Sequence, residues 1–146
     1  MKLRLVLAVV VLAACGGSAP LSPAEQLKQD AAQQFENIDS RYFDDSHAAV
    51  EAGKKTGGEA GYVETMNGLA DANHAFFQGL KAITFPSEDQ ADVRALLDVT
   101  VKIETETLLE VKAVGSTSLV SDLDARNAAD RSLRKDLGLD PAEIPS

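Results

Sequence analysis

Two Asp-x-x-His pairs, Asp44 with His47 and Asp71 with His74, come closest in residue type and spacing to metal chemistry. In helical metalloproteins, a carboxylate and a histidine three residues apart project from one side of a helix and bind the same ion. Here the spacing of the neighbouring apolar residues places both pairs on the outer faces of their helices. We therefore expect solvated side chains at these four positions and no metal site.

A second group of polar residues falls on the inward faces of the expected helices. Folding the chain back near residues 57, 86 and 116 brings Tyr42, Asn73, Thr100 and Asp130 to within about one helical turn, ~5 Å, of one level. Arg126, four residues before Asp130, is placed to pair with it. Two interpretations stand: a buried hydrogen-bonded layer that fixes the register of the helices, or a polar pocket for a small ligand. We favour the first.

The remaining composition excludes several classes of function. The chain has no nucleophile beside a base, no Gly-rich phosphate loop and no nucleophile elbow, so we predict no enzymatic activity. Two histidines and one cysteine are too few for a conventional zinc site, and no cofactor is expected. A formal net charge of −9 over 146 residues argues against nucleic acid as a partner.

The first fifteen residues have the pattern of an export signal. Lys2 and Arg4 precede an unbroken apolar run from Leu5 to Ala14. This run is shorter than the roughly 20 residues that a membrane-spanning helix needs. Residues 1–14 are therefore predicted to be a signal peptide. The run ends in Leu12-Ala13-Ala14-Cys15, followed by Gly16-Gly17-Ser18.

The sequence LAAC at 12–15 resembles the lipobox of bacterial lipoproteins. This resemblance implies cleavage before Cys15, a diacylglycerol on its sulfur and often an acylated new N-terminus. It also implies a cell-envelope protein, anchored to the outer face of the plasma membrane or, since Gly16 is not an aspartate, to an outer membrane. Two or three acyl chains anchor a protein more firmly than one. The alternative is an ordinary secretory signal followed by an incidental free cysteine.

Cleavage would change the charge and expose a tether. Residues 1–14 carry two basic and no acidic residues, so the mature chain would have a net charge of −11. Residues 15–21 combine the lipidated Cys15 with a Gly-, Ser-, Ala- and Pro-rich segment that reads as flexible. Extended, this segment reaches at most about 20–25 Å, which would hold the folded part close to the membrane.

Local signals divide residues 22–138 into four helices. Ser22 and Glu25 predict a capping box at the first start, and Ser87 and Gln90 predict another at the third. The first helix should run to about Lys55 and the fourth should begin at about Ser118. Breaks are expected at Thr56-Gly57-Gly58, after Phe85-Pro86 and at Gly115, and a Schellman ending at Gly138-Leu139 leaves a tail over 139–146.

The apolar residues recur every three or four positions, and no stretch alternates with a period of two. We therefore predict an all-α protein, an antiparallel up-down four-helix bundle. The expected inward residues are Ala31, Phe35, Ile38, Tyr42, Asp45, Ala49 and Ala52 in the first helix; Tyr62, Met66, Leu69, Asn73, Phe76, Leu80 and Ile83 in the second; Val93, Leu96, Leu97, Thr100, Ile103, Thr107, Val111 and Val114 in the third, widened by Val101 and Leu108; and Leu119, Leu123, Leu133 and Leu137 in the fourth.

The motifs Phe85-Pro86 and Arg134-Lys135-Asp136-Leu137-Gly138-Leu139 resemble small helical lipoproteins of actinobacterial type, a group that brings no activity with it. The expected function is that of a membrane-anchored, non-enzymatic bundle in the cell envelope, which acts in scaffolding or protein interaction. The alternative is an envelope ligand-binding module that uses the layer of Tyr42, Asn73, Thr100 and Asp130. An interaction protein should expose an apolar patch, whereas a ligand binder should have an open cavity between its helices.

Overall fold

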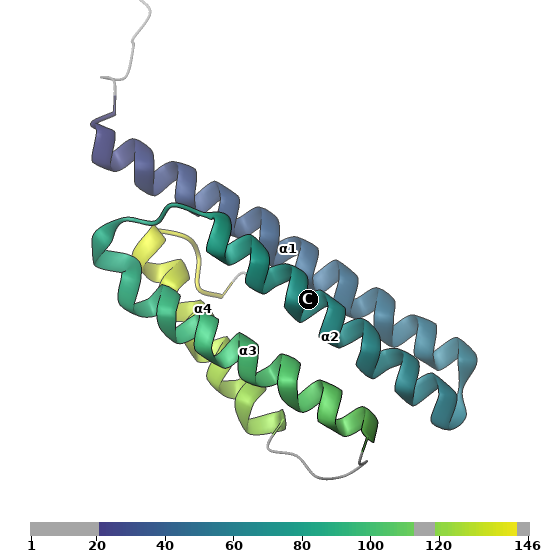
Figure 1. Ribbon diagram of the computed structural model, residues 1–146. Helices are drawn as coiled ribbons and strands as arrows, with labels where there is room; N and C mark the ends of the chain where they lie inside the picture. Colours follow the sequence, from purple (N-terminus) through teal and green to yellow (C-terminus); the bar gives the residue numbers. More distant parts are fainter. Residues whose placement is uncertain (1–20, 113–118, 143–146) are drawn as a thin grey trace, which may run out of the picture.

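The computed structural model describes residues 21–112 and 119–142, and within them the chain is helical and contains no strand (Figure 1). The predicted all-α class is therefore confirmed for this part. The signal peptide, Cys15, most of the tether, Val114 and the break at Gly115 lie outside the described residues. The helices are α1 (Pro23–Thr56), α2 (Gly58–Ala82), the short 3-10 helix η1 (Ser87–Asp89), α3 (Gln90–Lys112) and α4 (Leu119–Leu137).

The start of α1 follows the predicted capping box. The hydroxyl of Ser22 accepts a hydrogen bond from the backbone N–H of Glu25 at 3.3 Å, and the Glu25 carboxylate accepts one from the N–H of Ser22 at 2.8 Å. Pro23 occupies the first helical position, where its missing N–H costs nothing. Helix α1 then continues to Thr56, one residue beyond the predicted end.

The junction of α1 and α2 is shorter than predicted. Gly57 alone separates the two helices, so the expected three-residue break is wrong at Gly58, which already belongs to α2. Both glycines have positive φ, 70° and 59°, a region that favours glycine. Near this turn the helix backbones touch, because a Cβ atom on Gly61 would lie 2.2 Å from the carbonyl oxygen of Gly53.

The junction before α3 also differs from its prediction. The expected capping box between Ser87 and Gln90 is wrong, because Ser87 already begins the 3-10 turn η1, and Gln90 is the first residue of α3. The Ser87 hydroxyl donates to the carboxylate of Glu88 at 3.2 Å, while the Gln90 amide donates to the carbonyl of Phe85 at 3.3 Å. Gln90 thus fastens the start of α3 to the segment that leaves α2.

Helix α4 ends in the predicted Schellman motif. Gly138 has a φ of 80°, its N–H donates to the carbonyl of Lys135 at 3.1 Å, and the N–H of Leu139 donates to the carbonyl of Arg134 at 2.8 Å. The side chain of Arg134 also donates to the carbonyl of Asp140 at 3.0 Å. These bonds hold the first residues of the tail against the bundle.

The apolar core occupies one end of the molecule. Each helix packs against the next in sequence, and α4 also contacts α1. At the end near the α2–η1 junction, Phe35 and Phe76 meet edge to face at 6.4 Å between ring centroids. Towards the α1–α2 turn, the buried positions are mainly small or polar. The core cluster is Ala31, Ala32, Phe35, Tyr42, Ala72, Phe76, Leu80, Ile83, Phe85, Val93, Leu96, Leu133 and Leu137.

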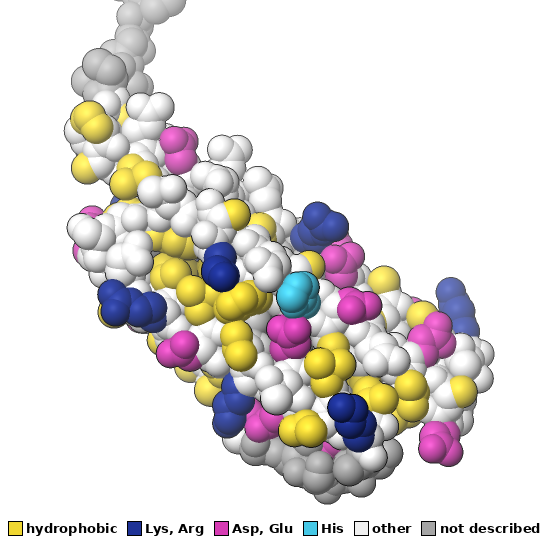
Figure 2. Space-filling view, in the orientation of Figure 1, with side chains coloured by type: hydrophobic (Ala, Val, Ile, Leu, Met, Phe, Trp, Pro, Cys, Tyr) yellow, Lys and Arg dark blue, Asp and Glu magenta, His cyan; other side chains and the backbone are white. Residues whose placement is uncertain are grey.

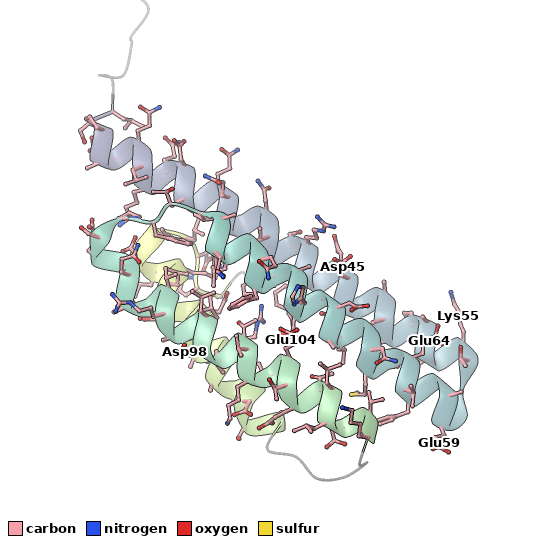
Figure 3. The ribbon with its side chains drawn as sticks, viewed as in Figure 1. Asp45, Lys55, Glu59, Glu64, Asp98 and Glu104 are labelled. Atoms are coloured by element: carbon pink, nitrogen blue, oxygen red, sulfur yellow. The ribbon has the colours of Figure 1, made fainter. Side chains whose placement is uncertain are left out.

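Four residues that were expected to face inward are exposed: Asp45, Val101, Leu108 and Leu123. The periodicity placed Asp45 on the apolar stripe, but its charge stays in water beside Arg41 at 3.6 Å (Figure 3). In α4, the neighbouring Asp122 takes the buried position instead of Leu123, because its carboxylate pairs with Lys102 of α3. The predicted stripe of α3 is buried from Val93 to Thr107, but Val101 and Leu108, which were expected to widen it, lie outside the buried face.

That inward face of α3 carries Val93, Leu96, Thr100, Ile103, Thr107 and Glu110. Beyond Ile103 it is polar: the Thr107 hydroxyl donates to the Ile103 carbonyl at 2.7 Å, and the Tyr62 hydroxyl of α2 donates to Glu110 at 3.1 Å. Helix α3 therefore buries polar residues in the same turns in which it exposes Val101 and Leu108.

Candidate functional site

The centre of the interior is a cluster of buried charges around Asp39 of α1. Asp39 is completely buried, and its carboxylate accepts a hydrogen bond from Nη1 of Arg134 at 3.0 Å. Nη2 of Arg126 lies 3.6 Å from the other carboxylate oxygen. Arg126 and Arg134 are eight residues apart, just over two turns of α4, so both reach the same carboxylate. These ion pairs attach α4 to α1.

Aromatic rings surround Arg126. Its guanidinium carbon lies 3.8 Å from the ring centroid of Tyr42, 4.7 Å from that of Phe76 and 5.8 Å from that of Phe43. A guanidinium over aromatic faces is attracted by the negative potential of the rings, and most strongly where water is excluded. Arg126 is only 2% exposed, so α1 and α2 form a socket of aromatic rings and one carboxylate into which α4 inserts this side chain.

The surroundings of the cluster raise the pKa of both of its carboxyl groups. Burial raises the pKa of Asp39 to about 6, and the nearby carboxylate of Asp130 adds to the rise, while Arg126 and Arg134 oppose it. Burial likewise raises the pKa of Asp130, against the pull of Arg126, Arg134 and Arg131. Two arginines and two carboxyl groups therefore share one interior site.

The four predicted layer residues Tyr42, Asn73, Thr100 and Asp130 are all buried. Tyr42 and Asp130 belong to the charged cluster. The other two bond within their own helices: the Asn73 amide donates to the Leu69 carbonyl at 2.8 Å, and the Thr100 hydroxyl donates to the Leu96 carbonyl at 2.7 Å. The structure thus brings Tyr42 to Arg126, and it places all four residues inside. Whether they fix register or bind a ligand stays a prediction.

Sequence reasoning missed Asp39 and Arg134. A signal for Arg134 is present, because Arg126, Asp130 and Arg134 recur every four residues and share one face of α4. Asp39 has a weaker signal. It lies four residues after Phe35 and three before Tyr42, but a lone acidic residue at such a position is usually exposed. Only the distant arginines of α4 make its burial tolerable.

Several buried polar atoms of this interior have no hydrogen-bond partner within the described residues. They include Oδ1 of Asp39, Oδ1 of Asn73, Nε and Nη2 of Arg126, and Oδ1 of Asp130. Buried polar groups of this kind are commonly satisfied by ordered water or a small polar molecule. The interior therefore contains both hydrogen-bond donors and acceptors that a small polar ligand could use.

A cavity of about 90 Å³ lies beside this cluster, between α1 and α2. Of the predicted layer it touches only Tyr42, so it is not the open pocket between helices that a ligand binder would have. Its volume suits one side chain, whereas pockets for metabolites usually measure roughly 300–1,000 Å³. The lining residues are Ile38, Arg41, Tyr42, Asp45, Ala72, Ala75, Phe76 and Gly79.

The two Asp-x-x-His pairs lie on the surface, as predicted. Asp44, His47, Asp71 and His74 are all exposed. Nδ1 of His74 lies 3.0 Å from a carboxylate oxygen of Glu104 of α3, which is labelled in Figure 3. Among the described residues, no three His, Cys, Asp or Glu side chains are grouped so that they could hold a metal ion.

The outer side of α3 and α4 carries large apolar side chains. Val101 and Leu108 are each 43% exposed, Leu109 51%, and Leu123 of α4 37%. Figure 2 shows hydrophobic side chains among charges of both signs on the visible face of the molecule. No helix in the described ranges is both long and apolar enough to cross a membrane.

No protein-family model, curated protein or solved structure matches this chain. Its function is therefore inferred from its own residues.

Proposed function

We propose that this protein is a lipid-anchored, non-enzymatic component of the cell envelope that binds another protein through the outer side of α3. Its four helices would form an antiparallel up-down bundle behind a cleaved signal peptide. One observation carries the interaction: in its second half, α3 buries Thr107 and Glu110 while it exposes Val101, Leu108 and Leu109. Each of these side chains is about half exposed, so it forgoes roughly half of the 1.5–3 kcal/mol that full burial would give, and a partner would recover part of this.

Support for the anchor comes from the N-terminal sequence. The basic residues, the short apolar run and the LAAC sequence that ends at Cys15 form the pattern of a lipoprotein signal. Residues 23–30 of α1 are largely exposed, and in Figure 1 this end of α1 projects past the other helices. These turns would serve as a short stalk between the acylated cysteine and the bundle.

The anchor is tested by replacing the cysteine. The variant Cys15→Ala should lose incorporation of labelled palmitate and should retain its signal peptide, because neither acylation nor lipoprotein cleavage can take place without the thiol. The matched control Ser18→Ala should be labelled and processed normally. Normal processing and membrane localisation of Cys15→Ala would contradict the lipoprotein assignment.

The interaction is tested by photo-crosslinking in intact cells. A photoreactive amino acid at Leu109, on the outer side of α3, should yield discrete cross-linked products. The same amino acid at Glu36, an exposed position on α1, should not. Equal products from both positions, or none from Leu109, would reject α3 as the interaction surface.

A second candidate function, binding of a small polar ligand, is favoured by the buried atoms around Arg126 and Asn73 that make no hydrogen bond within the described residues. It predicts that a thermal-shift screen of metals and small polar envelope metabolites finds a ligand that raises the melting temperature of the wild type. That rise should be lost in Asn73→Leu. If Asn73→Leu is simply more stable and binds partners as before, Asn73 belongs to a register layer.

A further inference from the structure

The exposed side of α3 carries a regular row of residues at spacings of three, four, three and four. We call this row the outer seam: Asp98, Val101, Thr105, Leu108 and Lys112, all of which are exposed. It spans about 21 Å, at 1.5 Å per residue. The buried residues Thr100, Ile103 and Thr107 lie on the other side of the same turns. Figure 3 labels Asp98 on the side of α3 that faces away from α2.

The outer seam is complementary to itself when it is reversed. When a second α3 is set antiparallel with Thr105 opposite Thr105, Asp98 lies level with Lys112, and Val101 lies within one residue, about 1.5 Å, of the level of Leu108. A two-fold symmetric interface requires this property, because each contact must occur twice with the roles exchanged. A parallel arrangement would instead place Asp98 against Asp98 and Lys112 against Lys112, and like charges across an interface repel.

The neighbouring side chains leave these two charges available. Lys102 pairs with Asp122, and Glu104 with His74, so the charges that flank the seam are engaged within the molecule. Asp98 and Lys112 have no ion-pair partner among the residues described. The Thr105 hydroxyl donates to the Val101 carbonyl at 2.9 Å, which leaves its methyl group free to pack at the centre.

We infer that the partner of the outer seam is a second copy of this chain, bound antiparallel with the two-fold axis at Thr105. This inference rests on the proposed interaction function of α3 and names its partner. The contact is one helix wide. Its core consists of two apolar pairs of Val101 with Leu108, and each end has an ion pair of Asp98 with Lys112. Leu109 lies beside this core. An interface of this size makes a modest dimer, suited to copies concentrated on one surface.

The charges provide the sharpest test, by sedimentation of the full chain in detergent. Wild type should form a concentration-dependent dimer. Asp98→Lys and Lys112→Asp should each weaken dimerisation by about tenfold or more, because each sets like charges opposite one another at both ends. The double variant Asp98→Lys/Lys112→Asp should restore the dimer. Asp44→Lys, which changes the net charge by the same amount as Asp98→Lys but lies on α1, should leave the dimer intact.

A cysteine at the two-fold axis provides the second test. Thr105→Cys should give a disulfide-linked dimer under mild oxidation, whereas Ala95→Cys, exposed on α3 but off the seam, should not. A monomeric wild type, or a double charge variant as weak as the single ones, would overturn the inference. If photo-crosslinks from Leu109 then reach only other proteins, the proposed function stands without the dimer; if no product forms, both fail.

Discussion

Asp39 is the residue at which the two buried ion pairs of the interior meet. Its carboxylate bridges Arg126 and Arg134 of α4, yet burial makes its ionised form costly. Ion pairs in the interior seldom add net stability, since desolvation offsets their attraction, but they are costly to break by removal of one partner. We therefore infer that Asp39 specifies where α4 docks.

The pH dependence of stability follows from this residue. A folded-state pKa of about 6, raised from 3.8, means that the folded protein binds a proton more tightly than the unfolded chain does. The resulting stabilisation is complete below pH 3.8 and is lost as the pH rises through 6. Asp89, Asp130 and Asp136, whose pKa values are also raised, act in the same direction.

We therefore expect the free energy of unfolding to increase from pH 8 to about pH 5, by about 1–1.5 kcal/mol from Asp39 alone. Asp39→Asn should remove much of this slope, whereas Asp44→Asn, on the surface, should keep it. Urea unfolding across this pH range measures both. A stability that falls between pH 7 and pH 5 would contradict the account.

Among the helices, the α1–α2 pair depends most on close contact. A Cβ atom on Gly68 would lie 2.5 Å from the Cβ of Ala49, and one on Gly79 would lie 2.8 Å from Cγ2 of Ile38. With the contact of Gly53 and Gly61, these positions show that small residues set the separation of the two helices along their length. Added volume there must push the helices apart.

Gly61→Ala should consequently destabilise the protein by about 1–3 kcal/mol, although alanine is the better helix former. The new Cβ atom would clash with the backbone of α1 at Gly53. Backbone atoms cannot relieve such a clash by a change of rotamer. Asn67→Ala, an exposed position in the same helix, should change stability by less than about 0.5 kcal/mol. Thermal denaturation measures the stability of both variants against the wild type. A Gly61→Ala variant with unchanged or higher stability would disprove the close contact.

Local signals predict the helices of this protein well. The capping box at Ser22, the break at Gly57 and the Schellman motif at Gly138 each depend on a few neighbouring residues. The inward face of α4 was harder to predict, since Leu123 fits the apolar spacing but Asp122 is buried by its pairing with Lys102 of α3. Asp39 was missed for the same reason, because its partners lie about 90 residues away in the sequence.

The two ends of the molecule differ in the polarity of their buried residues. Its apolar cluster lies towards the α2–η1 junction, whereas Thr107, Glu110 and Asp122 are buried towards the α1–α2 turn. A polar interior contributes less to stability than an apolar one of equal volume.

Hydrogen exchange should reveal this asymmetry. Amides in 31–38, 76–82 and 93–97 should exchange close to the rate of global unfolding, whereas those in 58–66 and 104–112 should exchange through local opening and be less protected. Peptide-resolved exchange with mass spectrometry measures the difference. Uniform protection along all of α2 and α3 would show that the polar end is as stable as the apolar one.

The central claim is that α3 presents its outer apolar residues to a partner and does not need them for folding. Its most direct test is the yield of photo-crosslinked product from Leu109 in intact cells, measured for wild type and for Val101→Ser/Leu108→Ser. The account predicts that the double variant loses the product while it keeps the wild-type melting temperature. A double variant that cross-links as well as wild type would contradict it.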